Sequence, residues 1–222
     1  MEDYEDSANS YYVIFASDIC WPRHAGCCAK VFAECLPASE RKSELGCWIL
    51  ASESVGPLPS RPMFWHLDKF STLALAEKAK ESHGTTLQAL GKAWLLTIAA
   101  AKRRPKGGEQ VANIGPLPVN PNTKYNAQYM EAIMDPGTVT AIHRHPGPEA
   151  WYTESGETCL ETPEGKQVGQ NGVSVVVPGG QPMRLSVTGT DQRRSLVLVL
   201  HDASQPWMVI APDWTAKGLC GK

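Results

Sequence analysis

The sequence predicts a mainly β protein, built around a β-sandwich or β-barrel. From Tyr125 onward, apolar segments of about four to seven residues alternate with glycine and proline turns about every 8–12 residues. The same region shows no helical periodicity until near its end. Short strands at such regular spacing are typical of all-β sandwiches and barrels.

Length and composition limit the class of protein further. The 222 residues allow one large domain, or one domain with a smaller appendage. The formal net charge is −2, from 21 basic and 23 acidic residues, which argues against nucleic acid or an anionic membrane as the main partner. No apolar run reaches the ~20 residues that span a bilayer. The acidic first residues are unlike a secretory leader, so we expect a cytoplasmic location by default.

The seven cysteines have two interpretations. Their number is odd, and the spacing of Cys20, Cys27, Cys28 and Cys35 matches no zinc pattern. A disulfide framework is one interpretation, and reduced, partly buried thiols are the other. We favour reduced thiols, which agree with a cytoplasmic location.

The N-terminal half is divided at a proline-rich linker. Residues 1–55 show no sustained period, which predicts an irregular leader, with disorder as the alternative. Residues 56–118 begin with Gly-Pro-Leu-Pro and predict a strand–helix–strand extension. The barrel is expected over residues 119–212, and a C-terminal tail over residues 213–222.

Within the extension, the sequence predicts a strand over residues 63–70 and a helix from Ser71 to about His83. A strand pattern follows over residues 85–90 and 94–100, split by Gly91. Ser71 is the expected N-cap, and Gly84 is expected in the left-handed conformation after the helix. The apolar residues Leu73, Ala76 and Ala79 mark the buried helix face.

One short segment, residues 143–149, contains a set of side chains that could bind a metal ion. His143 and His145 are two residues apart, so on a strand both imidazoles leave the same face. Pro146 and Pro148 hold the residues before them, His145 and Gly147, extended and then turn the chain. This lets Glu149 begin the next strand with its carboxylate facing the imidazoles. Two neutral imidazoles and one carboxylate with open positions form a facial triad for a first-row divalent metal.

These residues resemble the cupin superfamily. The first family motif, G-x5-H-x-H-x3-4-E-x6-G, is complete here, at Gly137, His143, His145, Glu149 and Gly156. The second motif, G-x5-P-x-G-x2-H, is met by Gly172, Pro178 and Gly180 but ends on Met183 in place of histidine. The resemblance covers about residues 110–210 and leaves the first hundred residues unexplained.

The resemblance implies a double-stranded β-helix, the jelly-roll barrel of the cupins, commonly as a homodimer. It also implies that His143, His145 and Glu149 bind one divalent transition metal, which could be Fe, Mn, Zn, Ni or Cu. A thioether is a poor ligand beside these donors, so Met183 is expected to line the pocket. His201 is a possible substitute for the missing ligand, and we favour a structural role for it.

The expected pocket residues follow from strand parity. Trp151 is two residues beyond Glu149 and is expected to share its face. Tyr129 and Glu131 share one face of the preceding strand, and we place Tyr129 in the pocket. Together with Met183, these aromatic residues would line a site for a small organic molecule.

Two functions compete for this site. The first is a metal-dependent enzyme, most readily an oxygenase, that acts on a small organic substrate. The second is a non-catalytic cupin that binds or senses a metal or small molecule. A third, a structural protein of the seed-storage kind, is disfavoured because the ligand set is complete. Fold alone does not separate an enzyme from a binding protein.

Overall fold

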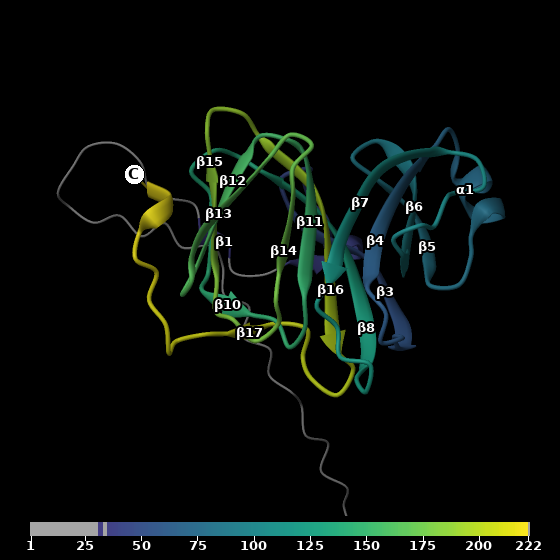
Figure 1. Ribbon diagram of the computed structural model, residues 1–222. Coiled ribbons are helices and arrows are strands. Elements are labelled where there is room, and N and C mark those ends of the chain that lie inside the picture. The colour runs from purple at the N-terminus through teal and green to yellow at the C-terminus, as the bar shows by residue number, and fades with distance from the viewer. Residues whose placement is uncertain (1–30, 33–34, 222) are drawn as a thin grey trace, which may run out of the picture.

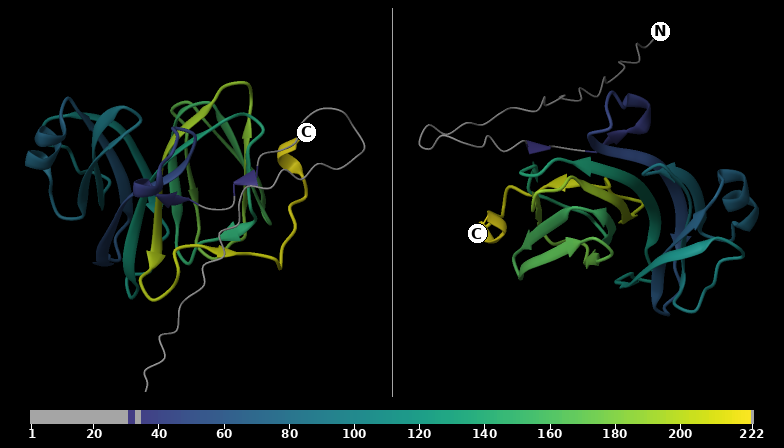
Figure 2. Two further views of the ribbon diagram at one scale, coloured as in Figure 1. Left: turned by 180° about the vertical axis from the view of Figure 1, so that it is seen from behind. Right: turned by 90° about the horizontal axis from the view of Figure 1, so that it is seen from above.

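A computed structural model describes residues 31–32 and 35–221 of the chain, and it confirms the mainly β fold class (Figure 1). In this described part, the strands form sheets of six, five and four strands and one two-stranded pair. The sheets lie in three layers, with the six-stranded sheet in the middle (Figure 2). None of the helices in the described ranges is long and apolar enough to cross a membrane.

We call the three layers the large, small and N-terminal sheets. In spatial order, the large sheet contains β14 (Ser174–Val177), β11 (Glu149–Ser155), β16 (Arg193–Asp202), β8 (Lys124–Met134), β3 (Gly46–Pro57) and β2 (Leu36–Pro37). The small sheet contains β1 (Val31–Phe32), β9 (Val139–Thr140), β15 (Arg184–Thr188), β12 (Glu157–Thr162) and β13 (Gly165–Gln170). The N-terminal sheet contains β5 (Gly84–Ala89), β6 (Lys92–Ala100), β4 (Met63–Phe70) and β7 (Glu109–Leu117). The remaining elements are the pair β10 (His143–Arg144) and β17 (Val209–Ile210), the helix α1 (Leu73–Ala79), and the 3-10 turns η1 (Ala38–Glu40) and η2 (Leu219–Gly221).

The central strands β8 and β16 are buried on both faces. Residues such as Tyr129 and Leu198 pack toward the N-terminal sheet, in a core that includes Trp65 and Trp94. The alternate residues, such as Met130 and Val197, point into the barrel between the large and small sheets. The large sheet therefore separates two apolar cores, and the metal candidates lie on the barrel side.

The strand–helix–strand extension forms as the N-terminal sheet, with three differences of detail. Helix α1 begins after Thr72, whose Oγ1 accepts a hydrogen bond from the Leu75 amide at 3.2 Å, so Thr72 and not Ser71 is the N-cap. The left-handed residue after the helix is His83, with φ of 57°, and not Gly84. Ala76 and Ala79 are buried as predicted, whereas Leu73 is exposed.

The prediction of an irregular leader through residue 55 is wrong for its last part. Strand β3 runs antiparallel to β8 from the pair Gly46–Ile133 to the pair Pro57–Lys124. It thereby becomes a member of the large sheet, and the barrel uses residues well before the expected boundary at residue 119. Apolar and polar residues alternate only weakly along β3, because one end of the strand is buried and the other is largely exposed. The strand was therefore hard to recognise from the sequence. The first 30 residues, with Cys20, Cys27 and Cys28, lie outside the described residues.

The prediction of reduced thiols is wrong for four cysteines. Disulfides join Cys35 to Cys47 and Cys159 to Cys220, over sequence separations of 12 and 61 residues. Spacing along the chain cannot reveal such pairs, because the strand register brings the cysteines together. Disulfides are typical of oxidising compartments, so these pairs do not support the predicted cytoplasmic location.

The C-terminal segment is anchored to the barrel by the second disulfide. In addition, the Glu161 carboxylate in β12 accepts hydrogen bonds from the amides of Lys217 and Leu219. The segment expected as a tail over residues 213–222 is therefore attached to the small sheet in its described part.

Candidate metal centre

The three candidate ligands lie on a short turn at the mouth of the barrel. His143 is in β10, His145 follows it, and Glu149 is the first residue of β11. Gly147 sits at the tightest point, where a β-carbon would lie 1.9 Å from the Leu200 carbonyl oxygen. Only glycine allows this approach. The turn thus brings Glu149 back against the two histidines, as the sequence predicted.

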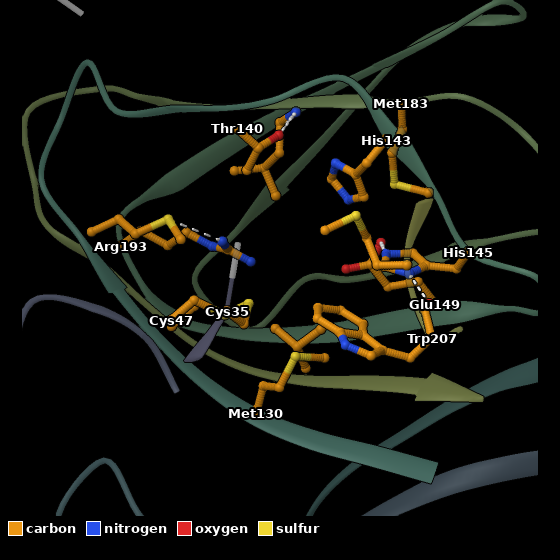
Figure 3. A pocket seen from close by; sticks show the side chains of 15 residues that line it. Cys35, Cys47, Met130, Thr140, His143, His145, Glu149, Met183, Arg193 and Trp207 are labelled. Carbon is orange, nitrogen blue, oxygen red and sulfur yellow. Dashed lines mark hydrogen bonds and ion pairs between the residues drawn. A yellow bond between two sulfur atoms is a disulfide. The ribbon is translucent and has the colours of Figure 1, made fainter. Parts of the chain in front are cut away.

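The side chains converge on one point. One ligand atom from each of His143, His145 and Glu149 lies within 4.8 Å of the other two. The His145 Nε2 and Glu149 Oε2 atoms are 3.5 Å apart, and the two imidazole ring centres are 5.0 Å apart. Figure 3 shows the three side chains pointing toward one another at the wall of a cavity.

Backbone carbonyls orient both imidazoles. The His143 Nδ1 lies 2.8 Å from the Ala141 oxygen, and the His145 Nδ1 lies 2.7 Å from the Trp207 oxygen. A carbonyl oxygen only accepts hydrogen bonds, so each neutral imidazole carries its proton on Nδ1 and leaves the Nε2 lone pair free. This is the outer-shell arrangement that fixes the tautomer of metal-binding histidines.

Burial keeps both imidazoles neutral. It lowers the pKa of His143, and it lowers the pKa of His145 to about 4. Burial also raises the pKa of Glu149, against the attraction of His143 and Arg193. Neutral imidazoles are the form that binds metal, so the two histidines need lose no proton at neutral pH.

The residues fit a transition metal. Glu149 Oε2 is buried without a hydrogen-bond partner, which is costly for a carboxylate oxygen unless another group binds it. Two nitrogen donors and one oxygen donor are a set that first-row divalent ions accept. A metal ion would satisfy the carboxylate and both Nε2 lone pairs together.

Met183 lies beside this group. Its backbone forms an isolated bridge with His143, with hydrogen bonds of 2.8 and 3.1 Å, so the two side chains are direct cross-strand neighbours. The Met183 side chain is buried and lines the cavity (Figure 3), where it was expected. His201 is not part of the converging group: its Nδ1 contacts the backbone oxygens of Asp202 and Gln205.

The cavity inside the barrel is mostly apolar. It has about 60 Å³ of free space for water-sized molecules, which is room for a few waters or one small organic molecule. Besides the three candidate ligands, its walls include Met130, Ala132, Met134, Thr140, Met183, Leu185, Arg193, Val197, Trp207, Met208 and the disulfide Cys35–Cys47.

The placement of Tyr129 in the pocket is wrong. Tyr129 packs in the core between the large and N-terminal sheets, and burial raises the pKa of its hydroxyl, which therefore stays protonated at neutral pH. Met130 on the opposite face lines the cavity instead. Parity could not settle this choice, because both faces of β8 are apolar.

Trp151 shares the face of Glu149, as predicted, and is fully buried in the barrel core. It does not belong to the cavity wall, because the Arg193 guanidinium lies over its ring at 5.9 Å. Arg193 itself and Trp207 were missed by the sequence analysis. Strand parity could have found Arg193, because it lies on the same face of its strand as Val197 and Val199. Trp207 lies in a loop, where no strand periodicity indicates which way a side chain points.

The neutral state of His145 predicts a pH dependence in the metal-free protein. Because its pKa is about 4 when folded and about 6.5 in the unfolded chain, the unfolded state binds more protons between these values. Acidification from pH 7 to pH 5 should therefore lower the free energy of unfolding by about 2 kcal/mol through this residue. The raised pKa of Glu149 has the opposite effect on the free energy of unfolding. The folded state then binds its proton more readily than the unfolded state, so acidification stabilises the fold through this residue.

Urea unfolding of chelator-treated protein at pH 7 and pH 5 measures this effect. The His145→Gln variant serves as the reference, because it keeps Glu149 and the other titrating groups. We expect the wild type to lose more stability on acidification than the variant does. Equal losses in the two proteins would show that His145 is not held neutral by the fold.

The segment from residue 130 to residue 199 matches the family model of the cupin domain. This match assigns the barrel to the cupin superfamily, as its motifs indicated. No curated protein matches the chain.

Some solved structures are similar to part of the chain. One is the DMSP lyase DddQ from Ruegeria pomeroyi, at 21% identity and a TM-score of 0.35, covering 40% of this chain and 45% of that one. Another is a cupin-like protein from Thermotoga maritima, at 14% identity and a TM-score of 0.35, covering 38% and 64%. A third is a salicylate 1,2-dioxygenase from Pseudaminobacter salicylatoxidans, at 18% identity and a TM-score of 0.30, covering 32% and 20%. This chain spans less than two thirds of the length of each, and the assignment rests on the match over residues 130–199.

Proposed function

We propose that the protein is a metal-dependent enzyme of the oxygenase kind that acts on a small organic molecule. The observation that supports this most is the convergence of His143, His145 and Glu149 at the wall of a mostly apolar cavity. Met183 stands where the second cupin motif has histidine, so the ion would keep coordination positions open toward the cavity. Bound iron(II) would supply the capacity to react with dioxygen.

The roles of the chain's own residues follow from the geometry. His143 and His145 would hold the ion through Nε2, with their Nδ1 protons on backbone oxygens. Glu149 would be a ligand and not a general base, because its carboxylate faces both imidazoles. The apolar wall would exclude water and bind the hydrophobic part of the substrate.

A non-catalytic binding or sensing protein is the second candidate. The small number of polar side chains in the cavity supports this candidate. Among the described residues that line the cavity, only Thr140 and Arg193 have polar side chains besides the candidate ligands and the disulfide. No separate acid–base pair is available there, which also argues against hydrolase or isomerase chemistry. The homodimer predicted from the family resemblance stays a prediction.

Metal analysis and oxygen uptake separate the candidates. The protein is purified without a histidine tag, analysed for metals, loaded with iron(II) without air, and then tested in an oxygen electrode against a panel of small organic molecules. We expect substrate-stimulated oxygen uptake that is absent from His143→Ala. A protein that binds iron and a panel compound but consumes no oxygen would support the sensing function, and zinc as the sole bound metal would also argue against an oxygenase.

A further inference from the structure

Arg193 is a buried cation that faces the same cavity. It is the first residue of β16, only 2% exposed, and its guanidinium points into the cavity across from the three candidate ligands (Figure 3). Burial lowers the pKa of Arg193 to about 10, against the attraction of Glu149, so the side chain is positively charged at neutral pH.

The hydrogen bonds of this guanidinium are incomplete. Its Nε donates to the Ser195 Oγ at 3.0 Å, and Nη1 donates to the Met134 sulfur at 3.7 Å, which is a weak acceptor. Nη2 is buried with no hydrogen-bond partner among the described residues. A buried cation with unused donors is costly unless an anion binds it.

Glu149 does not fill this role. No ion pair joins it to Arg193 within 4.0 Å in the described ranges, and its carboxylate lies beside His145 instead. A divalent ion at the candidate centre would be only partly neutralised by the carboxylate of Glu149. Together with Arg193, the ion would leave the cavity with an excess of positive charge. The electrostatics of the loaded cavity thus favour an anionic occupant.

The walls define the rest of that occupant. Around the charged groups the cavity is lined by methionine and aliphatic side chains, among them Met130, Met134 and Leu185. The free space of about 60 Å³ suits a small molecule. A guanidinium matches a carboxylate in shape and charge, because its planar N–H groups fit two oxygen atoms.

We propose that Arg193 binds the carboxylate of a small aliphatic carboxylic acid whose apolar part packs against the cavity wall. The role of this acid as substrate rests on the proposed function, whereas its binding to Arg193 does not require the metal. Arg193 would then determine substrate specificity at the end of the cavity opposite the candidate metal centre.

Propionate and its neutral analogue propionamide test this proposal by isothermal titration calorimetry. Wild-type protein is used both metal-free and loaded with zinc, which has no redox chemistry. We expect propionate to bind about tenfold or more tightly than propionamide in both forms, because the amide lacks the charge that Arg193 would pair with. This comparison needs no variant. Equal affinities of the acid and the amide would overturn the proposal.

Variants identify the residue responsible. Arg193→Met keeps the length and removes the charge, and it should weaken propionate binding about tenfold or more while metal content is unchanged. Arg193→Lys retains a positive charge and should recover part of the affinity. The matched control is Arg194→Met, because the neighbouring arginine points to the other face, where it pairs with Glu154 at 3.7 Å. Unchanged propionate binding in folded Arg193→Met would contradict the assignment.

The outcomes separate this proposal from the metal-dependent function. If metal binds and propionate binding depends on His143 but not on Arg193, the carboxylate binds the metal and the arginine assignment fails. If the protein binds no metal but discriminates propionate from propionamide through Arg193, the anion site stands and the metal-dependent function fails.

Discussion

Replacing His143 or His145 by alanine is expected to remove nearly all bound metal. The wild type should hold about one divalent ion per chain, and each variant less than about a tenth of that after dialysis. The reason is that three protein donors converge on the site, and losing one leaves two. Metal content is measured by plasma mass spectrometry on protein purified without a histidine tag.

His201→Ala is the matched control, because this histidine is buried in the same barrel but lies outside the converging group. It should keep its metal. The fold of the ligand variants should also persist, since two apolar cores stabilise the sheets without a metal. Full metal occupancy in the double alanine variant would refute the site, and unfolding of the metal-free protein at room temperature would refute the independence of the fold.

Replacing Met183 by histidine is expected to slow metal release. Position 183 is the direct cross-strand neighbour of His143, so an imidazole there can become a fourth protein ligand. Release to a chelator should slow by about tenfold or more, because an additional metal–nitrogen bond must break before the ion leaves. If the open position is used in turnover, oxygen uptake should fall as well. Release is followed by stopped-flow with a coloured chelator.

Met183→Leu separates the sulfur from the volume of the side chain. The swap keeps nearly the same volume and usually costs less than about 1.5 kcal/mol, so metal content should stay at the wild-type level. Metal loss in Met183→Leu as complete as in His143→Ala would mean that the thioether is a true ligand. A softer ion such as copper would then become the leading candidate.

The candidate metal centre could be predicted because its geometry is local. His143, His145 and Glu149 lie within seven residues, and the prolines and Gly147 between them define one turn. Strand parity and proline stereochemistry therefore suffice to bring the three side chains together.

The errors arose where both faces of a strand are apolar. Parity places Tyr129 and Met130 on opposite faces of β8, but it cannot say which face lines the barrel. In this protein the N-terminal sheet covers the outer face, so Tyr129 is buried away from the cavity. An exposed outer face would have been polar and would have settled the choice.

The amino-acid sequence was enough to predict the mainly β fold, the cupin motifs and the convergence of His143, His145 and Glu149. It was not enough to show that β3 completes the large sheet, that Cys35 pairs with Cys47, or that Arg193 faces the cavity. The difference has one physical cause. The first set depends on contacts between residues close in the chain, whereas the second depends on strand register between segments far apart, which the packing of whole sheets selects.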